Sequence, residues 1–297
     1  SFVVPSIFSF VKNKVETTSF FENLIHFITD KRNFGKSLFI DISSIEALTT
    51  DALMYLLAII NNLNERFQSQ YSISGNIPEI PSVRDTFLES GFLRYVQHRR
   101  SVSIEYKTDK VQIVTGDNSN TETAKQLSDF VCSKANVEKS ASKFLYTMII
   151  ELMSNTHKHA YIDKSTFLPR WYCFAEYNGD VIEFTFLDTG LGVPSTVRKN
   201  FVEKLDFLKL KNDSSYVTSA LNGEFRTETK HRHRGKGLPK IKEICTQGKI
   251  QNLRIISNKA DVSVTKDSIS ESESDLSLRG TIYRWDINLR NLKGFIL

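Results

Sequence analysis

The chain reads FLDTGLGVP over residues 186–194, at the end of an alternating apolar run that predicts a strand over residues 181–187. The Asp188 carboxylate is therefore expected at a strand end, with Gly190 and Gly192 close behind it. Glycine has no Cβ, so the backbone there can approach a planar ring closely. A carboxylate beside that ring can accept a hydrogen bond from an exocyclic amine, which favours adenine. A tight turn with a helix cap is the alternative interpretation.

A helix is expected over residues 142–160, and its second half reads ELMSNTHKHA. At about 3.6 residues per turn, Glu151, Asn155 and His159 share one helical face. Lys158 lies one step around that face. An amide oxygen is a hard ligand for magnesium, a carboxylate can orient a water molecule, and cations meet phosphate oxygens. This face has the groups that a metal–triphosphate needs, although a solvated polar helix face fits the same residues.

A third segment, RGKGL at residues 234–238, begins another helix. Free N–H groups and the helix dipole favour anions at a helix N-terminus, so this glycine-rich backbone can hold phosphate. The chain has no GxxxxGK[ST] sequence, which excludes a P-loop. A plain glycine turn is the alternative.

In order and spacing, these segments resemble the GHKL ATP-binding superfamily of histidine kinases, gyrase, Hsp90 and MutL. The resemblance covers roughly residues 108–290 and is closest to the histidine-kinase branch. Glu151 and Asn155 resemble the N box of that family. The remaining matches are Asp188, Gly190 and Gly192 to the G1 box, Gly235, Gly237 and Leu238 to the G2 box, and Thr281 to a late threonine that helps hold adenine.

The resemblance implies an α/β sandwich, with helices on one face of a mixed sheet and ATP with Mg²⁺ as ligands. Asp188 would then read adenine, and Asn155 would hold magnesium. Glu151 would polarise the attacking hydroxyl or water. Lys158, His159 and Lys236 would meet phosphates, and residues 195–234 would form a lid that ends in HRHR.

Further helices and strands are expected in this half of the chain. They are a helix at 124–135, a hairpin of strands at 171–177 and 181–187 around Asn178-Gly179, a helix that ends near Cys245, and strands at 253–257 and 281–289. Residues 265–278 are rich in serine and acid, so we expect a mobile hairpin loop there. A phosphorylated regulatory loop is the alternative.

The first half of the chain alternates strand and helix signals. Apolar runs at 37–42 and 71–75 predict strands, and apolar residues at three- and four-residue steps predict a helix over 53–63. A second, short helix is expected at 85–95. These elements indicate a compact α/β domain over residues 1–105, with the ATP-binding domain over residues 106–297.

The segments LFIDIS at 38–43 and LTTDAL at 48–53 resemble a STAS domain. That family carries a phosphorylatable serine where this chain has Asp51, with Thr50 beside it. Asp51 would either mimic a phosphate or simply cap the helix. A STAS-like domain fused to a GHKL domain resembles bacterial partner switching, which implies a protein partner. Neither His26 nor His98 lies in an acid-flanked helix before Glu151, which disfavours phosphorylation on histidine.

Composition narrows the function classes. A net charge of +5 over 297 residues is too small to indicate nucleic acid without a basic stripe. Three sparse cysteines indicate a reducing compartment, and no apolar run reaches the length of about 18 residues that a membrane span needs. We therefore expect a cytoplasmic protein. Histidine pairs at 157/159 and 231/233 lack a cysteine or second acid to complete a zinc site.

The sequence predicts a signalling enzyme that binds Mg-ATP. It would either transfer the γ-phosphate to a protein side chain (serine, threonine or histidine) or hydrolyse ATP. The alternative is an ATP-dependent conformational switch that controls a protein–protein interaction without turnover. A scaffold without nucleotide requires all three glycine and helix segments to be coincidental. The sequence leaves a homodimer open.

Overall fold

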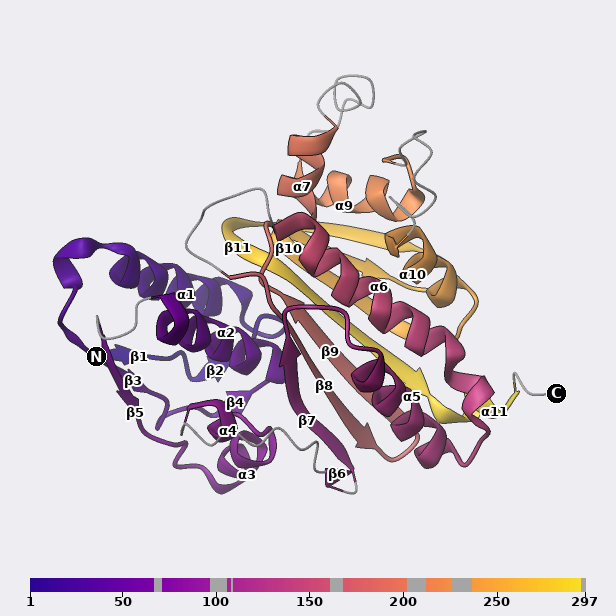
Figure 1. Ribbon diagram of the computed structural model, residues 1–297, viewed down its shortest axis with the longest axis horizontal. Helices are drawn as coiled ribbons and strands as arrows, with labels where there is room; N and C mark the ends of the chain where they lie inside the picture. Colours follow the sequence, from indigo (N-terminus) through magenta and orange to yellow (C-terminus); the bar gives the residue numbers. More distant parts are fainter. Residues whose placement is uncertain are drawn as a thin grey trace. The chain divides into compact units, whose positions relative to one another are not determined.

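The computed structural model describes residues 1–66, 71–96, 106–107, 109–160, 168–201, 212–225 and 237–294. By its contacts the chain divides into two compact units, Ser1–Val114 with Lys164–Leu168, and Thr115–Asp163 with Pro169–Leu297. Parallel sheets with helices form the first unit, and an antiparallel sheet with helices follows (Figure 1). The predicted α/β class is confirmed at this level.

The first unit is built on short parallel strands. Its strands are β1 (Phe2–Val3), β2 (Ile7–Phe8), β3 (Ser37–Asp41), β4 (Ala47–Leu48) and β5 (Ser72–Gly75), in the sheets β1-β3-β5 and β2-β4. Its helices are α1 (Lys14–Thr29), the 3-10 turn η1 (Lys31–Asn33), α2 (Thr50–Arg66), α3 (Pro81–Glu89) and α4 (Leu93–Val96). The predicted strands β3 and β5 and the predicted helix α2 are confirmed. α2 is buried nearly all round, since every residue from Asp51 to Ile60 is buried, as are Asn62 and Leu63.

The first unit has an aromatic core, in which Phe21 and Tyr55 join α1 to α2 with ring centroids 4.7 Å apart. At the start of α2, Asp51 is buried and accepts hydrogen bonds from the Ala52 amide at 2.7 Å and from the Thr49 hydroxyl. Asp51 is the second residue of α2, so its carboxylate lies in the first turn of the helix, where negative charge is favourable, and not at the residue before the helix. A buried carboxylate of this kind is a poor surface mimic of phosphate.

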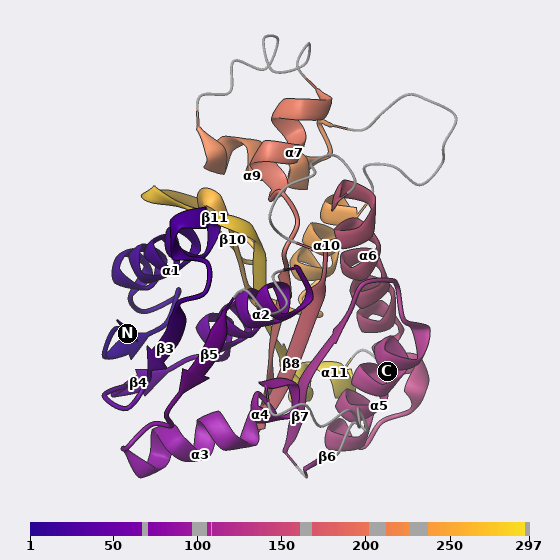
Figure 2. The ribbon, with the colours of Figure 1, turned by 60° about the vertical axis from the view of Figure 1, so that its left-hand side comes forward.

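A six-stranded sheet runs in the order β10-β11-β9-β8-β7-β6 (Figure 2). Its strands are β6 (Tyr106–Lys107), β7 (Lys110–Gly116), β8 (Trp171–Asn178), β9 (Val181–Asp188), β10 (Gln251–Val264) and β11 (Ile269–Asn288). The pairs β6/β7, β8/β9, β9/β11 and β10/β11 are antiparallel. The predicted β8–β9 hairpin is confirmed, with Gly179 at φ +69° in its turn.

Helices α5, α6 and α10 lie on one face of this sheet in both ribbon views (Figures 1 and 2). The helices of the second unit are α5 (Thr121–Ala135), η2 (Lys139–Ser142), α6 (Lys143–Ala160), α7 (Val193–Asn200), α9 (Asp213–Asn222), α10 (Gly237–Thr246) and α11 (Leu289–Gly294). The Asn120 side chain caps α5 by accepting the Thr123 amide at 2.9 Å. Asn136, at φ +53°, ends that helix with the left-handed residue that helix ends favour.

The interpretation of residues 265–278 as a mobile loop is wrong. The hairpin turn is short, and β11 begins at Ile269, where it pairs with Val264 of β10. Helix α9 is fastened to this part of β11, because the Ser214 amide and hydroxyl donate to Glu273 and to the Ser272 carbonyl. Composition suggested a loop because these side chains bury little apolar area. Main-chain pairing and α9 hold the strand instead.

The chain passes very close to itself where β11 reaches the end of β9. Gly280 has φ +92°, and a Cβ there would overlap the Asp188 carbonyl oxygen. Only glycine fits that position, for both steric and conformational reasons.

We therefore expect Gly280→Ala to lower the free energy of unfolding by about 3 kcal/mol or more, because strain and overlap add. The matched control is Gly248→Ala, since Gly248 has φ +73° but open space around it. That change should cost only about 1–2 kcal/mol. Urea unfolding of both variants measures the difference, and equal losses would contradict the close approach.

Candidate functional site

A row of side chains crosses four strands of the sheet at the end of β9. Strand register pairs Asp188 with Trp171 on β8 and with Thr281 on β11, and pairs Thr281 with Ser257 on β10. Paired residues of neighbouring antiparallel strands project from the same face. Asp188 and Thr281, which lie far apart in sequence, are therefore neighbours in the sheet.

The Asp188 carboxyl lies in buried surroundings, with only 9% of the residue exposed. Trp171, Phe186 and Tyr283 are buried nearby, with Phe186 6.3 Å by ring centroid from each of the other two. Burial raises the pKa of Asp188 to about 6, while hydrogen bonds from the Gly190 amide and the Thr281 side chain pull it down. The Gly190 bond is 2.9 Å long. Burial outweighs the hydrogen bonds, so this carboxyl changes charge close to neutral pH.

A second cluster lies between α6 and the start of α10. A Cβ added to Gly237 would lie 2.9 Å from the Asn155 amide nitrogen and 3.4 Å from a Glu151 carboxylate oxygen. Glu151 and Asn155 are one turn apart on α6, as predicted, and both are half-buried. The structure thus brings together three residues that the sequence placed in two separate segments.

Several predicted site residues lie elsewhere or outside the described part of the chain. Leu238 packs against the apolar cluster of Val197, Tyr216, Ala220 and Phe225. Gly192 packs against Asn258. Residues Gly235 and Lys236, the HRHR segment at 231–234, His98 and the side chains of His157, Lys158 and His159 lie outside the described residues. Of the predicted lid, α7 and α9 are described.

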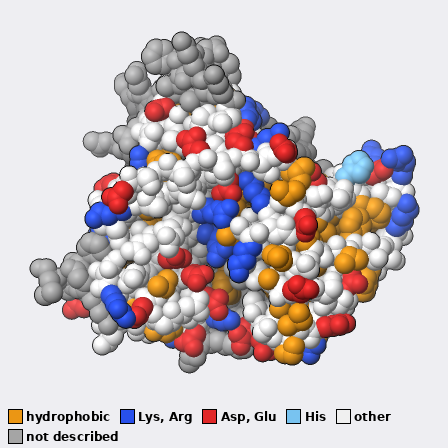
Figure 3. Space-filling view, turned by 180° about the vertical axis from the view of Figure 1, so that it is seen from behind, with side chains coloured by type: hydrophobic (Ala, Val, Ile, Leu, Met, Phe, Trp, Pro, Cys, Tyr) orange, Lys and Arg blue, Asp and Glu red, His pale blue; other side chains and the backbone are white. Residues whose placement is uncertain are grey.

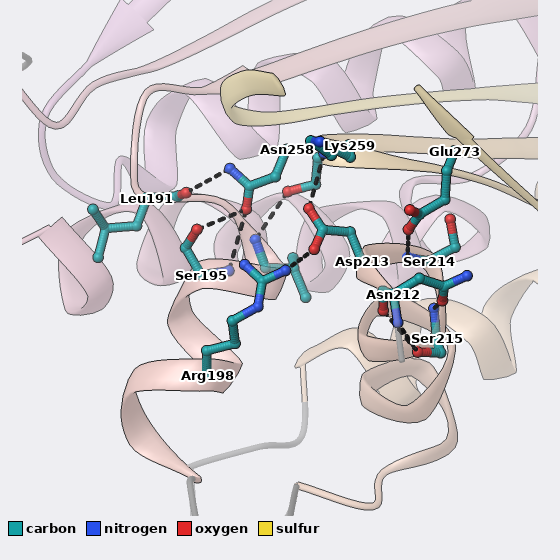
Figure 4. Close-up of polar contacts among 12 residues, drawn as sticks. Leu191, Ser195, Arg198, Asn212, Asp213, Ser214, Ser215, Asn258, Lys259 and Glu273 are labelled. Carbon is teal, nitrogen blue, oxygen red and sulfur yellow. Dashed lines mark hydrogen bonds and ion pairs between the residues drawn. The ribbon is translucent and has the colours of Figure 1, made fainter. Parts of the chain in front are cut away.

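Asn258 of β10, which is not among the site residues predicted from the sequence, holds the glycine loop after β9 (Figure 4). The Asn258 amide nitrogen donates to the carbonyls of Leu191 at 3.0 Å and Leu278 at 3.2 Å. Its amide oxygen accepts from the Ser195 amide at 3.2 Å and the Ser195 hydroxyl at 3.0 Å. All of its principal hydrogen-bonding capacity is used, so the loop and the first turn of α7 are fixed to β10.

Asp213, at the start of α9, makes the next link in the same network (Figure 4). It is buried, accepts the Lys259 amide at 3.0 Å and pairs with Arg198 of α7. The Arg198 guanidinium also lies 4.9 Å from the centroid of the Tyr216 ring. α7, α9 and β10 are therefore joined by charged hydrogen bonds as well as by apolar contact.

A sequence signal for Asn258 was weak. The residue has φ +52°, a conformation that asparagine tolerates better than most residues, and register shifts lie on both sides of it. Its partners Leu191 and Ser195 lie more than sixty residues away in sequence, and Leu278 lies 20 residues away. The sequence pattern around Asn258 therefore does not predict its role in holding the loop.

Comparison with models of known protein families gives no match, and no curated protein sequence matches the chain. Within the described ranges, no helix combines the length and apolar character needed to cross a lipid bilayer. All three cysteines, Cys132, Cys173 and Cys245, are buried and free.

The raised pKa of Asp188 has a consequence for stability. Because folding favours the protonated carboxyl, this stabilisation is complete below the ordinary value of 3.8 and is lost as pH rises through about 6. We expect Asp188→Asn to gain stability over the wild type by up to about 3 kcal/mol between about pH 4 and pH 7. Urea unfolding across that range measures the difference.

Asp30→Asn is the matched control for this pH series. The Arg32 side chain lowers the pKa of Asp30 to about 2, so its charge stabilises the fold as pH rises. That stabilisation is present above the ordinary value of 3.8 and is lost as pH falls through about 2. The difference between this variant and the wild type should therefore stay nearly constant between about pH 5 and pH 7 and shrink only at lower pH. A pH-independent difference for Asp188→Asn would contradict the burial of that carboxyl.

Proposed function

We propose that the second unit binds ATP with Mg²⁺ in the manner of the GHKL superfamily. The observation that carries the proposal is the pairing of Asp188 with Thr281 across β9 and β11, beneath the glycine loop. This is the carboxylate–threonine pair that the resemblance assigns to adenine. In support, Gly237 contacts Glu151 and Asn155, which are the residues assigned to the phosphate end.

At the adenine end, Asp188 supplies a hydrogen-bond acceptor with an apolar floor. A buried carboxylate is satisfied by an exocyclic amine and is repelled by a carbonyl oxygen, so adenine is favoured over guanine. Buried aromatic residues around it, including Trp171 and Phe186, provide the low-dielectric surroundings in which that hydrogen bond counts most.

At the phosphate end, the donor set fits a metal–triphosphate. The Asn155 amide oxygen suits magnesium, and the Glu151 carboxylate lies on the same face of α6. The absence of a side chain at Gly237 lets Asn155 and Glu151 lie close to the start of α10, whose first amides would hold phosphate oxygens. Larger residues at that position would press on Asn155.

For the reaction, bound ATP would supply the γ-phosphoryl group. Glu151 would accept the proton of the attacking hydroxyl or water, as general bases at such sites do. Transfer to a protein side chain and hydrolysis differ only in the acceptor. The second candidate, a switch without turnover, would act through the polar network that joins α7 and α9 to β10, if bound nucleotide changed which of its bonds are made.

The first unit would be a STAS-like interaction domain for a protein partner in cytoplasmic signalling. Among the described residues, the large hydrophobic side chains with the greatest exposure all belong to this unit, including Val3, Val15 and Phe39 at 59%, 65% and 38%. Figure 3 shows hydrophobic side chains on the surface seen from behind. A contiguous apolar patch marks an interaction surface, and these side chains are where the proposal would place one on this unit.

Asp188→Ala should weaken ATP binding about 10- to 100-fold in a calorimetric titration with magnesium, because a hydrogen bond to a charged group is lost. GTP should bind the wild type far more weakly than ATP. Unchanged ATP affinity in the variant would remove the adenine assignment.

Glu151→Gln separates the enzyme from the switch. It keeps the size of the side chain and removes the base, so ATP binding should persist while ADP formation falls about 100-fold or more. Incubation with γ-labelled ATP measures release and protein labelling together. Equal and negligible turnover in the wild type and the variant would favour the switch over the enzyme.

A further inference from the structure

Thr189, the residue between Asp188 and Gly190, makes hydrogen bonds that neither the sequence motifs nor the proposed function explains. The residue is buried. Its main-chain amide donates to the Arg170 carbonyl at 3.0 Å. Its hydroxyl accepts the Arg170 amide at 2.9 Å and donates its own proton to the Arg170 carbonyl at 3.2 Å. Thr189 thus bonds both main-chain polar groups of the residue that comes just before β8.

These bonds extend the ladder between β8 and β9 by one residue. The register that pairs Asp188 with Trp171 places Thr189 opposite Arg170. In a regular antiparallel ladder, the two residues of a hydrogen-bonded pair exchange both of their main-chain bonds. The Thr189 amide makes the first of these bonds. The Thr189 hydroxyl accepts the Arg170 amide, a bond that the Thr189 carbonyl would make in a regular strand. The side chain therefore keeps β9 on β8 where the main chain turns into the glycine loop.

The same ladder explains why Thr189 matters to the Asp188 carboxyl. Hydrogen-bonded and non-hydrogen-bonded pairs alternate, so Asp188 and Trp171 form a pair of the second kind, in which the side chains lie closest. The Asp188 carboxyl also accepts the Gly190 amide at 2.9 Å. Its position therefore depends on the direction in which the chain leaves β9, and Thr189 is the residue at which that direction is fixed.

The strands on either side of Thr189 are held in place by other contacts. On the β8 side, the Trp171 indole N–H donates to the Asn118 carbonyl at 2.8 Å, and a Cβ at Gly116 would lie 2.6 Å from the Trp171 ring. On the β11 side, a Cβ at Gly280 would lie 3.3 Å from the Thr189 Cα. The Thr189 hydroxyl therefore ties the end of β9 to a strand that has its own anchor.

We propose that Thr189 is a positioning residue for the adenine end of the site, whose hydroxyl holds the Asp188 carboxyl and the start of the glycine loop in the geometry that binds adenine. The inference rests on the proposed function. Because the hydroxyl is bonded to Arg170, Thr189 acts through Asp188 and not by touching the nucleotide. An acceptor that is already in position binds its ligand more tightly, since less ordering is left to the binding step.

A double-mutant cycle tests this role in the full chain with magnesium. ATP affinity is measured for the wild type, Thr189→Val, Asp188→Ala and the double variant. Valine keeps the shape of the side chain and removes the hydroxyl, so Thr189→Val should weaken ATP binding about fivefold. The double variant should bind no more weakly than Asp188→Ala, because Thr189 has no effect once the carboxyl is gone.

The first unit offers a matched control. The buried hydroxyl of Thr17 accepts the Ser9 amide and donates to the Ser9 carbonyl, both at 3.1 Å, which is the arrangement that Thr189 makes with Arg170. Thr17→Val therefore removes the same kind of bonds and should leave ATP affinity unchanged. Thr189→Ser keeps the hydroxyl and should restore most of the affinity that Thr189→Val loses.

Hydrogen exchange measures the positioning without nucleotide. The Gly190 amide is bonded to the Asp188 carboxyl, so it should exchange faster in Thr189→Val than in the wild type or Thr189→Ser.

The outcomes separate the two proposals. Wild type that binds no ATP overturns the proposed function and the role of Thr189 in nucleotide binding with it. Wild type that binds ATP, with unchanged affinity in Thr189→Val or with additive losses in the double variant, overturns the positioning role alone. An equal loss of affinity in Thr17→Val, or an unchanged exchange rate at Gly190, does the same.

Discussion

The pairing of Thr281 with Asp188 across β9 and β11 is the contact on which the candidate site depends. It requires β11 to run directly against the end of β9, and Gly280 permits that approach because a side chain would overlap the Asp188 carbonyl oxygen. The register of the hairpin partner β10 then follows, and with it the position of Ser257. A shift of one residue would turn Asp188 or Thr281 to the other face of the sheet and separate them.

The register shift around Asn258 in β10 positions the glycine loop and helix α7 next to Asp188 and Thr281. Regular strands present alternate side chains and use their main-chain groups in the ladder, so they offer little to a neighbouring loop. Around Asn258 the register shifts, and the side chain instead satisfies carbonyl and amide groups of the glycine loop and α7. The next residue of β10 holds α9 as well, because the Lys259 amide donates a hydrogen bond to Asp213 at the start of that helix. Bulges of this kind re-aim side chains where a fold needs them.

Several elements of the second unit and one helix of the first could be predicted from the sequence, because their signals are local. Period and turn chemistry are local, and they predicted the β8–β9 hairpin, α2 and the one-turn spacing of Glu151 and Asn155. The contact of Gly237 with those two side chains was suggested only by resemblance. The Asn258 network and the strand at the start of β11 were not predicted, because both depend on partners remote in sequence. Composition predicted a loop at residues 265–278, and this was wrong because main-chain pairing between strands does not depend on side-chain type.

The aspartates of the chain help to separate a site residue from a turn residue. Asp30 and Asp41 serve local structure, and their partners lower their pKa values: Arg32 for Asp30, and Ser43 with Asn76 for Asp41. Such carboxylates are exposed to water or fully bonded, so their charge stabilises the fold. Asp188 also follows a strand and also bonds a nearby amide, yet burial moves its pKa in the opposite direction. A raised pKa means that the charged carboxylate destabilises the fold at neutral pH, and a turn or cap does not require this loss of stability. Under the proposed function, a ligand that brings its own hydrogen-bond donor to the buried carboxylate would offset that cost.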